Sequence, residues 1–219
     1  MSGPITRQIF EDMPRRILSE GRRANAELFC CCINGEKWAV KDFSACPLMV
    51  KKTWGRWMTR REYRILVRLK GIEGVPAEPF LLDAYAVGYR FIQGKSLRKA
   101  EPGEIPTSFF YELEELVQRI HRFNIVHLDI RNRRNILISQ NSRPYLLDFQ
   151  SGLDLTRIPC FLRGLLKDID LSGVYKSWIR LRPDLMDEKR LAHLNVFGRK
   201  RSLWIFKGRS GRSRGRRRY

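Results

Sequence analysis

Apolar residues recur with two different periods along the chain, and the change of period divides the chain in two. Up to residue 92 the apolar runs are short and strand-like, with one helical segment, 54–69, among them. Beyond residue 93 they recur at helical spacing, over 106–122, 158–166 and 171–181. The pattern predicts an α+β fold with a small β-sheet and one helix first and a short, mainly helical part second.

Four strands are predicted in the first part. Residues 27–33 and 37–43 flank Asn34-Gly35, which is the strongest short signal for a two-residue β-hairpin and hence for antiparallel pairing. Runs 79–82 and 84–92 follow the helix, so the order is β-β-α-β-β. Residues 1–20 carry one weak amphipathic pattern, which predicts a short helix lying on the body.

Gln93-Gly94-Lys95 forms a polar, flexible interruption between the two parts, and we place a lobe boundary there. Three regions are expected: an N-terminal lobe at 1–92, a C-terminal lobe at 93–190, and a basic, aromatic and arginine-rich tail at 191–219.

The stretch from residue 125 to residue 150 organises the candidate chemistry. Asp129 stands in a polar loop between apolar runs, and Asp148 ends the next apolar run. Strand-like segments 135–138 and 144–147, joined by a turn-forming Ser-Gln-Asn-Ser-Arg, bring the two loop ends side by side. A hairpin with an acid at each open end predicts a site for a metal ion and phosphate. Taken singly, each acid could equally cap a turn.

Two further charged residues stand in regular elements of the first part. Strand alternation puts Lys41 on the same face as Ala39 and Phe43. A strand lysine commonly extends to solvent, so Lys41 taken alone does not indicate a functional role. Glu62 sits in the predicted helix among five arginines, where it either relieves a basic face or orients Lys41.

The chain has a formal charge of +20, and its last 31 residues hold twelve cations and no acid. Such a field attracts polyanions: nucleic acid, an anionic membrane face, lipopolysaccharide phosphates or nucleotides. The five cysteines lack metal-ligand spacing, which favours buried thiols in a reducing compartment. Neither a signal peptide nor a spanning helix is evident, so a cytoplasmic protein is expected.

The order of the charged residues resembles that of a protein-kinase-like fold: a strand lysine, a helix glutamate, His127-x-Asp129, Asn135 opening a strand, and Asp148-Phe149 closing it. More narrowly, the segments AVKDF, RREYRIL, YRFIQGKSL, VHLDIRNRRNILI and YLLDFQSG look like the compact bacterial lipopolysaccharide kinase family of Kdo and heptose kinases. That family is itself similar to RIO-type kinases. The resemblance covers about residues 25–185 and implies a two-lobed kinase-like fold.

The resemblance also implies ATP and Mg²⁺ as cofactors and assigns the nucleotide contacts. Lys41 would hold the α- and β-phosphates, and Glu62 would keep the lysine ammonium in place. The adenine would be held by the backbone of Phe91, Ile92, Gln93 and Gly94.

Four residues of the central stretch are assigned to metal binding and phosphoryl transfer by the same resemblance. Asp148 would bind Mg²⁺, with the side-chain oxygen of Asn135 as a second ligand. Asp129 would accept the proton of the attacking hydroxyl and orient it. Arg131 would neutralise the γ-phosphate.

Several features depart from the kinase pattern. The position five residues after Asp129, where kinases place the metal-binding asparagine, is Arg134, with Asn132 and Asn135 on either side. No G-x-G-x-x-G loop is found near Gly21, so the phosphates must be covered by other backbone. Gln150 follows Asp-Phe in place of glycine, and no Ala-Pro-Glu segment follows.

Three functions follow from the pattern. The first is an ATP-dependent kinase that phosphorylates a hydroxyl of a lipopolysaccharide-core sugar or a similar small-molecule or glycolipid acceptor. Trp204 and Phe206, set among cations, suit peripheral contact with the inner face of a membrane. The alternatives are a RIO-like protein Ser/Thr kinase, and a catalytically dead kinase-like module that binds nucleic acid or anionic surfaces through its basic body and tail.

Overall fold

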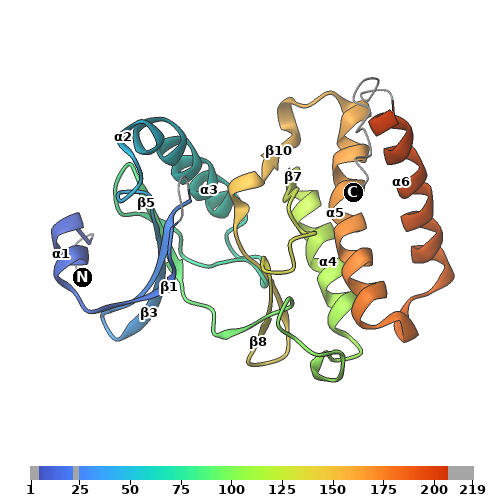
Figure 1. The fold of residues 1–219 in the computed structure, drawn as a ribbon, viewed down its shortest axis with the longest axis horizontal. Helices are drawn as coiled ribbons and strands as arrows, with labels where there is room; N and C mark the ends of the chain where they lie inside the picture. Colours follow the sequence, from blue (N-terminus) through green and yellow to red (C-terminus); the bar gives the residue numbers. More distant parts are fainter. Residues whose placement is uncertain (1–4, 22–24, 207–219) are drawn as a thin grey trace, which may run out of the picture.

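The structure, a computed structural model, describes residues 5–21 and 25–206, and for 199–206 it describes the backbone alone. An N-terminal sheet with its helices lies on one side, a bundle of helices lies on the other, and short strands lie between them (Figure 1). The tail expected at 191–219 therefore lies partly outside the described residues, as do the side chains of Trp204 and Phe206.

The N-terminal sheet has five antiparallel strands in the order β1-β2-β3-β5-β4. Their bounds are Arg15–Ser19, Glu27–Ile33, Glu36–Asp42, Phe80–Leu81 for β4 and Ala86–Arg90 for β5. Asn34 and Gly35 have φ of 53° and 79°, and Ile33 pairs with Glu36. The predicted Asn-Gly hairpin is confirmed, because this turn requires positive φ at both central residues.

The first 20 residues hold more structure than the short helix expected there. Helix α1 spans Arg7–Asp12, and the chain then enters edge strand β1, which pairs with β2. Ile17 belongs to this strand and is largely exposed, whereas Phe10 is fully buried. The amphipathic pattern was too weak to show a strand whose residues are all exposed.

Helix α3 (Arg56–Arg68) is preceded without a break by α2 (Leu48–Val50) and a π-helical turn, Lys51–Gly55. Ile65, Leu66 and Leu69 bury its apolar stripe in the main core, as predicted from their spacing. The same stripe carries Glu62, which is only 1% exposed. The helix therefore presents one acid inward and its arginines outward.

A three-stranded sheet in the order β6-β8-β9 joins the two parts. The predicted hairpin is present as β8 (Ile136–Ser139) and β9 (Pro144–Leu146). The expected flexible interruption at 93–95 forms part of edge strand β6 (Gly94–Ser96), which pairs with β8. A Cβ on Gly94 would lie 2.3 Å from the carbonyl oxygen of Ile138, so the close approach of the two strands requires glycine.

Three helices form the C-terminal part: α4 (Phe109–Arg122), α5 (Cys160–Leu181) and α6 (Glu188–Phe206). The two helices expected over 158–166 and 171–181 are one continuous helix of 22 residues. Strand β7 (Ile125–Val126) follows α4 and pairs with β10 (Leu153–Asp154). Short 3-10 turns complete the connections, at Pro102–Glu104, Phe149–Ser151, Leu155–Arg157 and Pro183–Leu185.

The expected boundary at residue 191 falls inside α6, and Phe197 of that helix is buried. An ionic cluster fixes this helix to the bundle: Glu114 on α4 accepts a hydrogen bond from Tyr175 on α5, and Arg190 Nε donates to Glu114 at 2.8 Å. The first turns of α6 therefore belong to the helical body rather than to a free tail.

All five cysteines are free thiols, and the described residues contain no group of three or more His, Cys, Asp or Glu side chains arranged to hold a metal ion. None of the helices within the described residues combines the length and the apolar character that crossing a bilayer requires.

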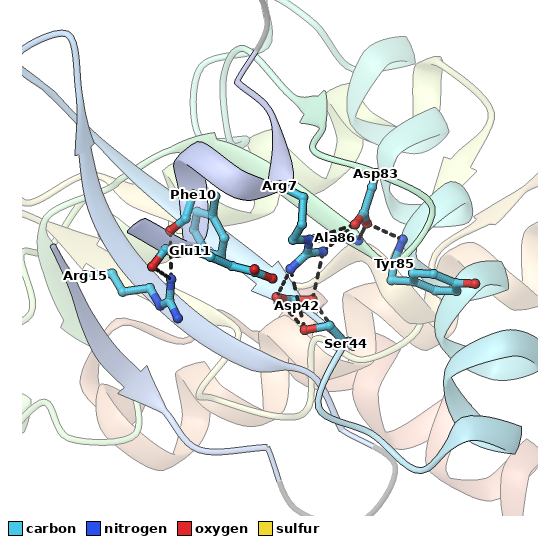
Figure 2. Close-up of polar contacts among 9 residues, drawn as sticks. All are labelled: Arg7, Phe10, Glu11, Arg15, Asp42, Ser44, Asp83, Tyr85 and Ala86. Carbon is cyan, nitrogen blue, oxygen red and sulfur yellow. Dashed lines mark hydrogen bonds and ion pairs between the residues drawn. The ribbon is translucent and has the colours of Figure 1, made fainter. Parts of the chain in front are cut away.

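Arg7 fastens α1 to the outer face of the sheet. Figure 2 shows its guanidinium between two carboxylates: Nε donates to Asp83 Oδ2 at 2.8 Å, and Nη1 pairs with Asp42. Asp42 is buried and also accepts the backbone N–H of Ser44 at 2.8 Å. Asp83 Oδ1 accepts the N–H of Tyr85 at 2.7 Å, so the guanidinium links two turns of the chain.

Arg7→Ala should lower the free energy of unfolding by about 1–3 kcal/mol, because it leaves the buried Asp42 carboxylate without its cation. Urea denaturation measures the change. Arg16→Ala on the exposed face of β1 is the control and should stay within about 0.5 kcal/mol of the parent chain. Equal effects of the two substitutions would rule out the fastening role.

Candidate active site

Lys41 lies at the end of β3 and bridges two acids from different parts of the chain. Its Nζ is 2.7 Å from Glu62 Oε1 on α3 and 2.8 Å from Asp148 Oδ1, which follows β9. The lysine and the glutamate are buried, while the side chain of Asp148 is 40% exposed. Three predicted site residues, separated by as many as 107 positions, are thus brought into one ionic triad.

The triad shifts the pKa of each member. Burial alone would lower the pKa of the Lys41 ammonium, but Glu62 and Asp148 outweigh this effect and raise it. Burial raises the pKa of the Glu62 carboxyl, and the Lys41 charge opposes this without cancelling it. Burial also acts to raise the pKa of Asp148, yet Lys41 lowers it overall. Lys41 is therefore protonated and Asp148 ionised at neutral pH.

Asp148 is held by the backbone on both sides. It adopts the left-handed conformation, with φ of 65°, a region that aspartate enters more readily than most residues. Just before it, the Leu147 N–H donates to the carbonyl of Asn135 at 2.8 Å. Just after it, Phe149 is fully buried against the His127 ring, with centroids 4.7 Å apart. The carboxylate is thereby directed from a rigid turn.

The catalytic loop predicted around Asp129 is closed by asparagine side chains. Asn135 Nδ2 donates to Asp129 Oδ2 at 2.8 Å and to its carbonyl oxygen at 3.1 Å, and Asn132 Nδ2 reaches the same Oδ2 at 3.3 Å. The Asn135 N–H donates to the carbonyl of Asn132 at 2.8 Å. The loop residue that is extra relative to the kinase pattern is therefore accommodated in a turn. These contacts use the amide nitrogen of Asn135 and leave its side-chain oxygen for another partner.

The two loop arginines take opposite directions. Arg131, expected at the γ-phosphate, donates from Nη2 to Ser172 Oγ on α5 at 3.0 Å and does not line the cleft beside the triad. Arg134 does line that cleft, together with Asn132 and Asn135. The loop with one extra residue thus turns Arg134 inward, and the expectation for Arg131 is wrong in its geometry.

Asp170 on α5 supports the catalytic loop and was not singled out from the sequence. Its buried carboxylate accepts the backbone N–H groups of His127 and Leu128, each at 2.7 Å, and lies 3.1 Å from His121 Nε2. Leu128 has φ of 64°, a conformation that costs energy for a bulky residue. An acid between the predicted helices 158–166 and 171–181 was the available signal, but helix periodicity does not say what such an acid faces.

A cleft of about 890 Å³ opens in front of the triad. Tyr89 of β5 lines it, as do Ser19 and Glu20 at the end of β1 and Asn25 and Ala26 before β2. A Cβ on Gly21 would lie 2.5 Å from the carbonyl oxygen of Asn25, so the connection needs glycine there. Residues 19, 20, 25 and 26 therefore lie beside the triad, where the backbone cover expected in place of a G-x-G-x-x-G loop is needed.

The expected adenine contacts are not brought to this cleft. Phe91, Ile92 and Gln93 line a separate hollow of about 560 Å³, together with Gly74 to Ala77 and Ser139 to Asn141. The Phe91 N–H is already bonded to the carbonyl of Lys37 at 2.9 Å. Gly94 lies in β6 and lines neither hollow.

The cleft wall combines cationic side chains with hard oxygen donors. Lys41 and Arg134 supply positive charge, and Asp148 and Asn135 supply the carboxylate and amide oxygens that Mg²⁺ prefers. Asp148 and Asn135 would hold the ion, and the phosphates of a nucleotide would supply further oxygen ligands. The residues present therefore fit a nucleotide with its magnesium ion.

The sequence profile described as the RIO domain matches residues 40–178, more than half of the chain. The chain belongs to the RIO domain family. The matched span of this RIO domain runs from β3 to the last turns of α5 and so includes the triad, the catalytic loop and Asp170. A search of curated protein sequences finds no match.

The solved structures similar to this RIO domain include the Rio2 kinase of Chaetomium thermophilum. Its ADP/Mg²⁺-phosphoaspartate complex aligns with a TM-score of 0.57 and 13% identity over 90% of this chain and 74% of that one. A second Rio2 structure from the same organism aligns with a TM-score of 0.57 and 14% identity over 89% of this chain and 75% of that one. The α+β kinase-like fold class is confirmed; at these identities the likeness shows the fold alone.

Lys41→Met should cost about 3–5 kcal/mol of stability at pH 7.5, because it leaves the Glu62 and Asp148 carboxylates unpaired. Without the ammonium, the pKa values of these two carboxyls in the folded variant should exceed their unfolded values of about 4. An acid whose pKa is raised by folding lowers the free energy of unfolding as pH rises. In the parent chain the ammonium lowers the pKa of Asp148 and partly offsets the raised pKa of Glu62, so the corresponding loss of stability over this pH range is smaller. The difference should therefore grow between about pH 4 and pH 7.

Urea denaturation at pH 4.5 and pH 7.5 measures this difference. Lys37→Met, on an exposed position of the same strand, is the matched control and should be nearly neutral at both pH values. A loss for Lys41→Met that does not depend on pH would show that packing, rather than charge, makes the triad stabilising.

Proposed function

We propose that this RIO domain is an ATP- and Mg²⁺-dependent phosphotransferase that moves the γ-phosphate to a hydroxyl group, with a protein side chain as the favoured acceptor. The observation that carries the proposal is the contact of Lys41 with both Glu62 and Asp148 at the wall of the cleft. Phosphoryl transfer depends on positioning and charge neutralisation, which a fixed cation beside a metal-binding acid supplies.

In this proposal Lys41 holds the α- and β-phosphates, and Glu62 keeps its ammonium in place. Asp148 and the side-chain oxygen of Asn135 bind Mg²⁺, which neutralises charge on the phosphates when bound. Arg134, rather than Arg131, supplies positive charge at the γ-phosphate, because it is the loop arginine that lines the cleft. Residues 19, 20, 25 and 26, which line the cleft, cover the phosphates.

Asp129 accepts the proton of the attacking hydroxyl. Its Oδ2 accepts hydrogen bonds from two side-chain amide nitrogens, which orient the carboxylate. Asp170 acts through the loop backbone as a positioning residue.

The family match supports a RIO-like protein kinase over a lipopolysaccharide-sugar kinase. Rio2 kinase has been crystallised with ADP, Mg²⁺ and a phosphoaspartate, which makes ATP and Mg²⁺ the nucleotide and metal to test here. The sugar acceptor, the cytoplasmic location and the inner-membrane contact remain predictions from the sequence. The catalytically inactive alternative predicts no phosphoryl transfer from the same cleft.

Asp148→Asn and Asp129→Asn separate metal binding from proton acceptance. With ATP and Mg²⁺, the parent chain should show a raised thermal midpoint and should transfer ³²P to itself or to a generic protein acceptor. Asp148→Asn should lose the Mg²⁺-dependent part of the midpoint shift, while Asp129→Asn should keep it and transfer phosphate at least ~100-fold more slowly.

Asp12→Asn, far from the cleft and exposed, is the control for both variants. No shift with ATP and Mg²⁺ in the parent chain would refute nucleotide binding. A shift without transfer, unchanged in Asp129→Asn, would support the inactive alternative. Phosphorylation of a lipopolysaccharide acceptor, but of no protein, would favour the sugar-kinase function over the protein-kinase function.

Asn135→Ala should raise the Mg²⁺ concentration needed for half-maximal transfer by about tenfold or more, because it removes one of two proposed protein ligands. Asn132→Ala removes a 3.3 Å contact to Asp129 Oδ2 and a 3.3 Å contact from the Arg134 N–H, neither of which is a proposed metal ligand, and should leave the Mg²⁺ requirement near that of the parent. A magnesium titration of the transfer rate measures both. A larger shift for Asn132→Ala would reassign the ligand.

A further inference from the structure

A second groove, of about 890 Å³, runs along the outer face of α3, and it shares no lining residue with the cleft. Its other wall is the segment after Asp148, from Gly152 to Arg157, and Figure 1 shows α3 and β10 next to each other. Its charged lining consists of six arginines and a single acid: Arg56, Arg60, Arg61, Arg64, Arg68, Arg157 and Asp154.

Two of the arginines join the walls of the groove. Arg61 Nε donates to the carbonyl of Gly152 at 2.6 Å, and Arg68 pairs with Asp154 and donates to the carbonyl of Phe123 at 2.9 Å. Arg68 thus already neutralises the only acid of the lining. The segment after Asp148 is held against α3 without help from the remaining arginines.

The other four, Arg56, Arg60, Arg64 and Arg157, are exposed. None of them makes an ion pair or a hydrogen bond with any residue in the described ranges 5–21 and 25–206. Four guanidinium groups with no acid between them repel one another, and a groove lined by one sign of charge concentrates its field. The charge of the groove is therefore complementary to an anion that presents several negative charges in a row.

An aromatic side chain lies among these cations. Trp57 lines the groove and is 48% exposed, with the Trp54 ring centroid 5.3 Å from its own. The Arg61 guanidinium carbon lies 4.7 Å from the Trp57 centroid. Both neighbours limit the motion of the indole, which gives the groove a supported, partly open ring surface.

We propose that this groove binds single-stranded nucleic acid, with phosphates on the unpaired arginines and a base stacked on Trp57. Planar guanidinium forks suit phosphate oxygens, and an exposed indole suits an unstacked base. In a duplex the bases are stacked on one another and unavailable to the ring. A flat bilayer surface does not reach a floor formed by Ile65 and Gly152. This binding goes beyond phosphoryl transfer and does not depend on it.

The test uses the full chain and a fluorescently labelled 20-nucleotide oligouridine, with binding followed by anisotropy from low to high salt. Arg60→Gln with Arg64→Gln should weaken binding about tenfold or more and reduce the slope of log K against log salt by roughly 1.4, since each lost phosphate contact removes ~0.7. Trp57→Ala should weaken binding about fivefold or more without changing the slope, because it removes stacking alone.

Arg122→Gln with Lys176→Gln is the matched control, since it removes the same charge from exposed positions on α4 and α5. It should change the affinity less than threefold. Circular dichroism confirms that every variant is folded. Phosphatidylglycerol vesicles and a 20-base-pair duplex serve as competing ligands in parallel measurements.

Loss of oligouridine affinity confined to the groove variants supports the proposal. It is overturned if the parent chain does not bind oligouridine, or if the control weakens binding as much as Arg60→Gln with Arg64→Gln. Vesicle binding lost in the groove variants with oligouridine binding retained would assign the groove to an anionic bilayer, and equal affinity for the duplex would exclude stacking on Trp57.

Discussion

The bridge from Lys41 to Glu62 and Asp148 is the interaction on which the arrangement of this protein depends. It joins β3, α3 and the turn after β9, which are distant in sequence and share no other charged contact of this kind among the described residues. Each of these charges is costly to bury alone, and together they compensate one another. The position of α3 against the sheet, and of Asp148 against both, therefore follows from one ammonium group.

A second buried acid, Asp170, holds the backbone of the catalytic loop in place. Asp170 takes two consecutive N–H groups of the catalytic loop, at a point where Leu128 adopts an unfavourable backbone conformation. Bonds to a charged acceptor are stronger than neutral ones, so they offset this local strain. Asp129 then leaves the loop in a direction set by α5, and the asparagines hold its carboxylate there.

Helix α3 shows how one element serves two surfaces. Its inward stripe carries the acid that pairs with Lys41, and its outward face carries Arg56, Arg60 and Arg64, which make no ion pair with the described residues. A helical period allows this division, because residues three and four positions apart share a face. The same helix therefore contributes an acid to the ionic triad and arginines to an open cationic groove, and its net charge alone reveals neither.

The sequence by itself determined the elements with strong local signals: the Asn34-Gly35 hairpin, the apolar stripes of α3 and α4, the β8–β9 hairpin, and the order of Lys41, Glu62, Asp129 and Asp148. Periodicity failed for β1, whose residues are exposed, and for α5, which is one helix instead of two.

Only the tertiary structure decided which loop arginine faces the cleft, that residues 91–93 line another hollow, and that Asp170 supports the loop. These features depend on contacts between residues 40 or more positions apart, or on the direction a side chain leaves an irregular loop. Local sequence preference carries no information about either, because both are set by packing and by the satisfaction of buried charges.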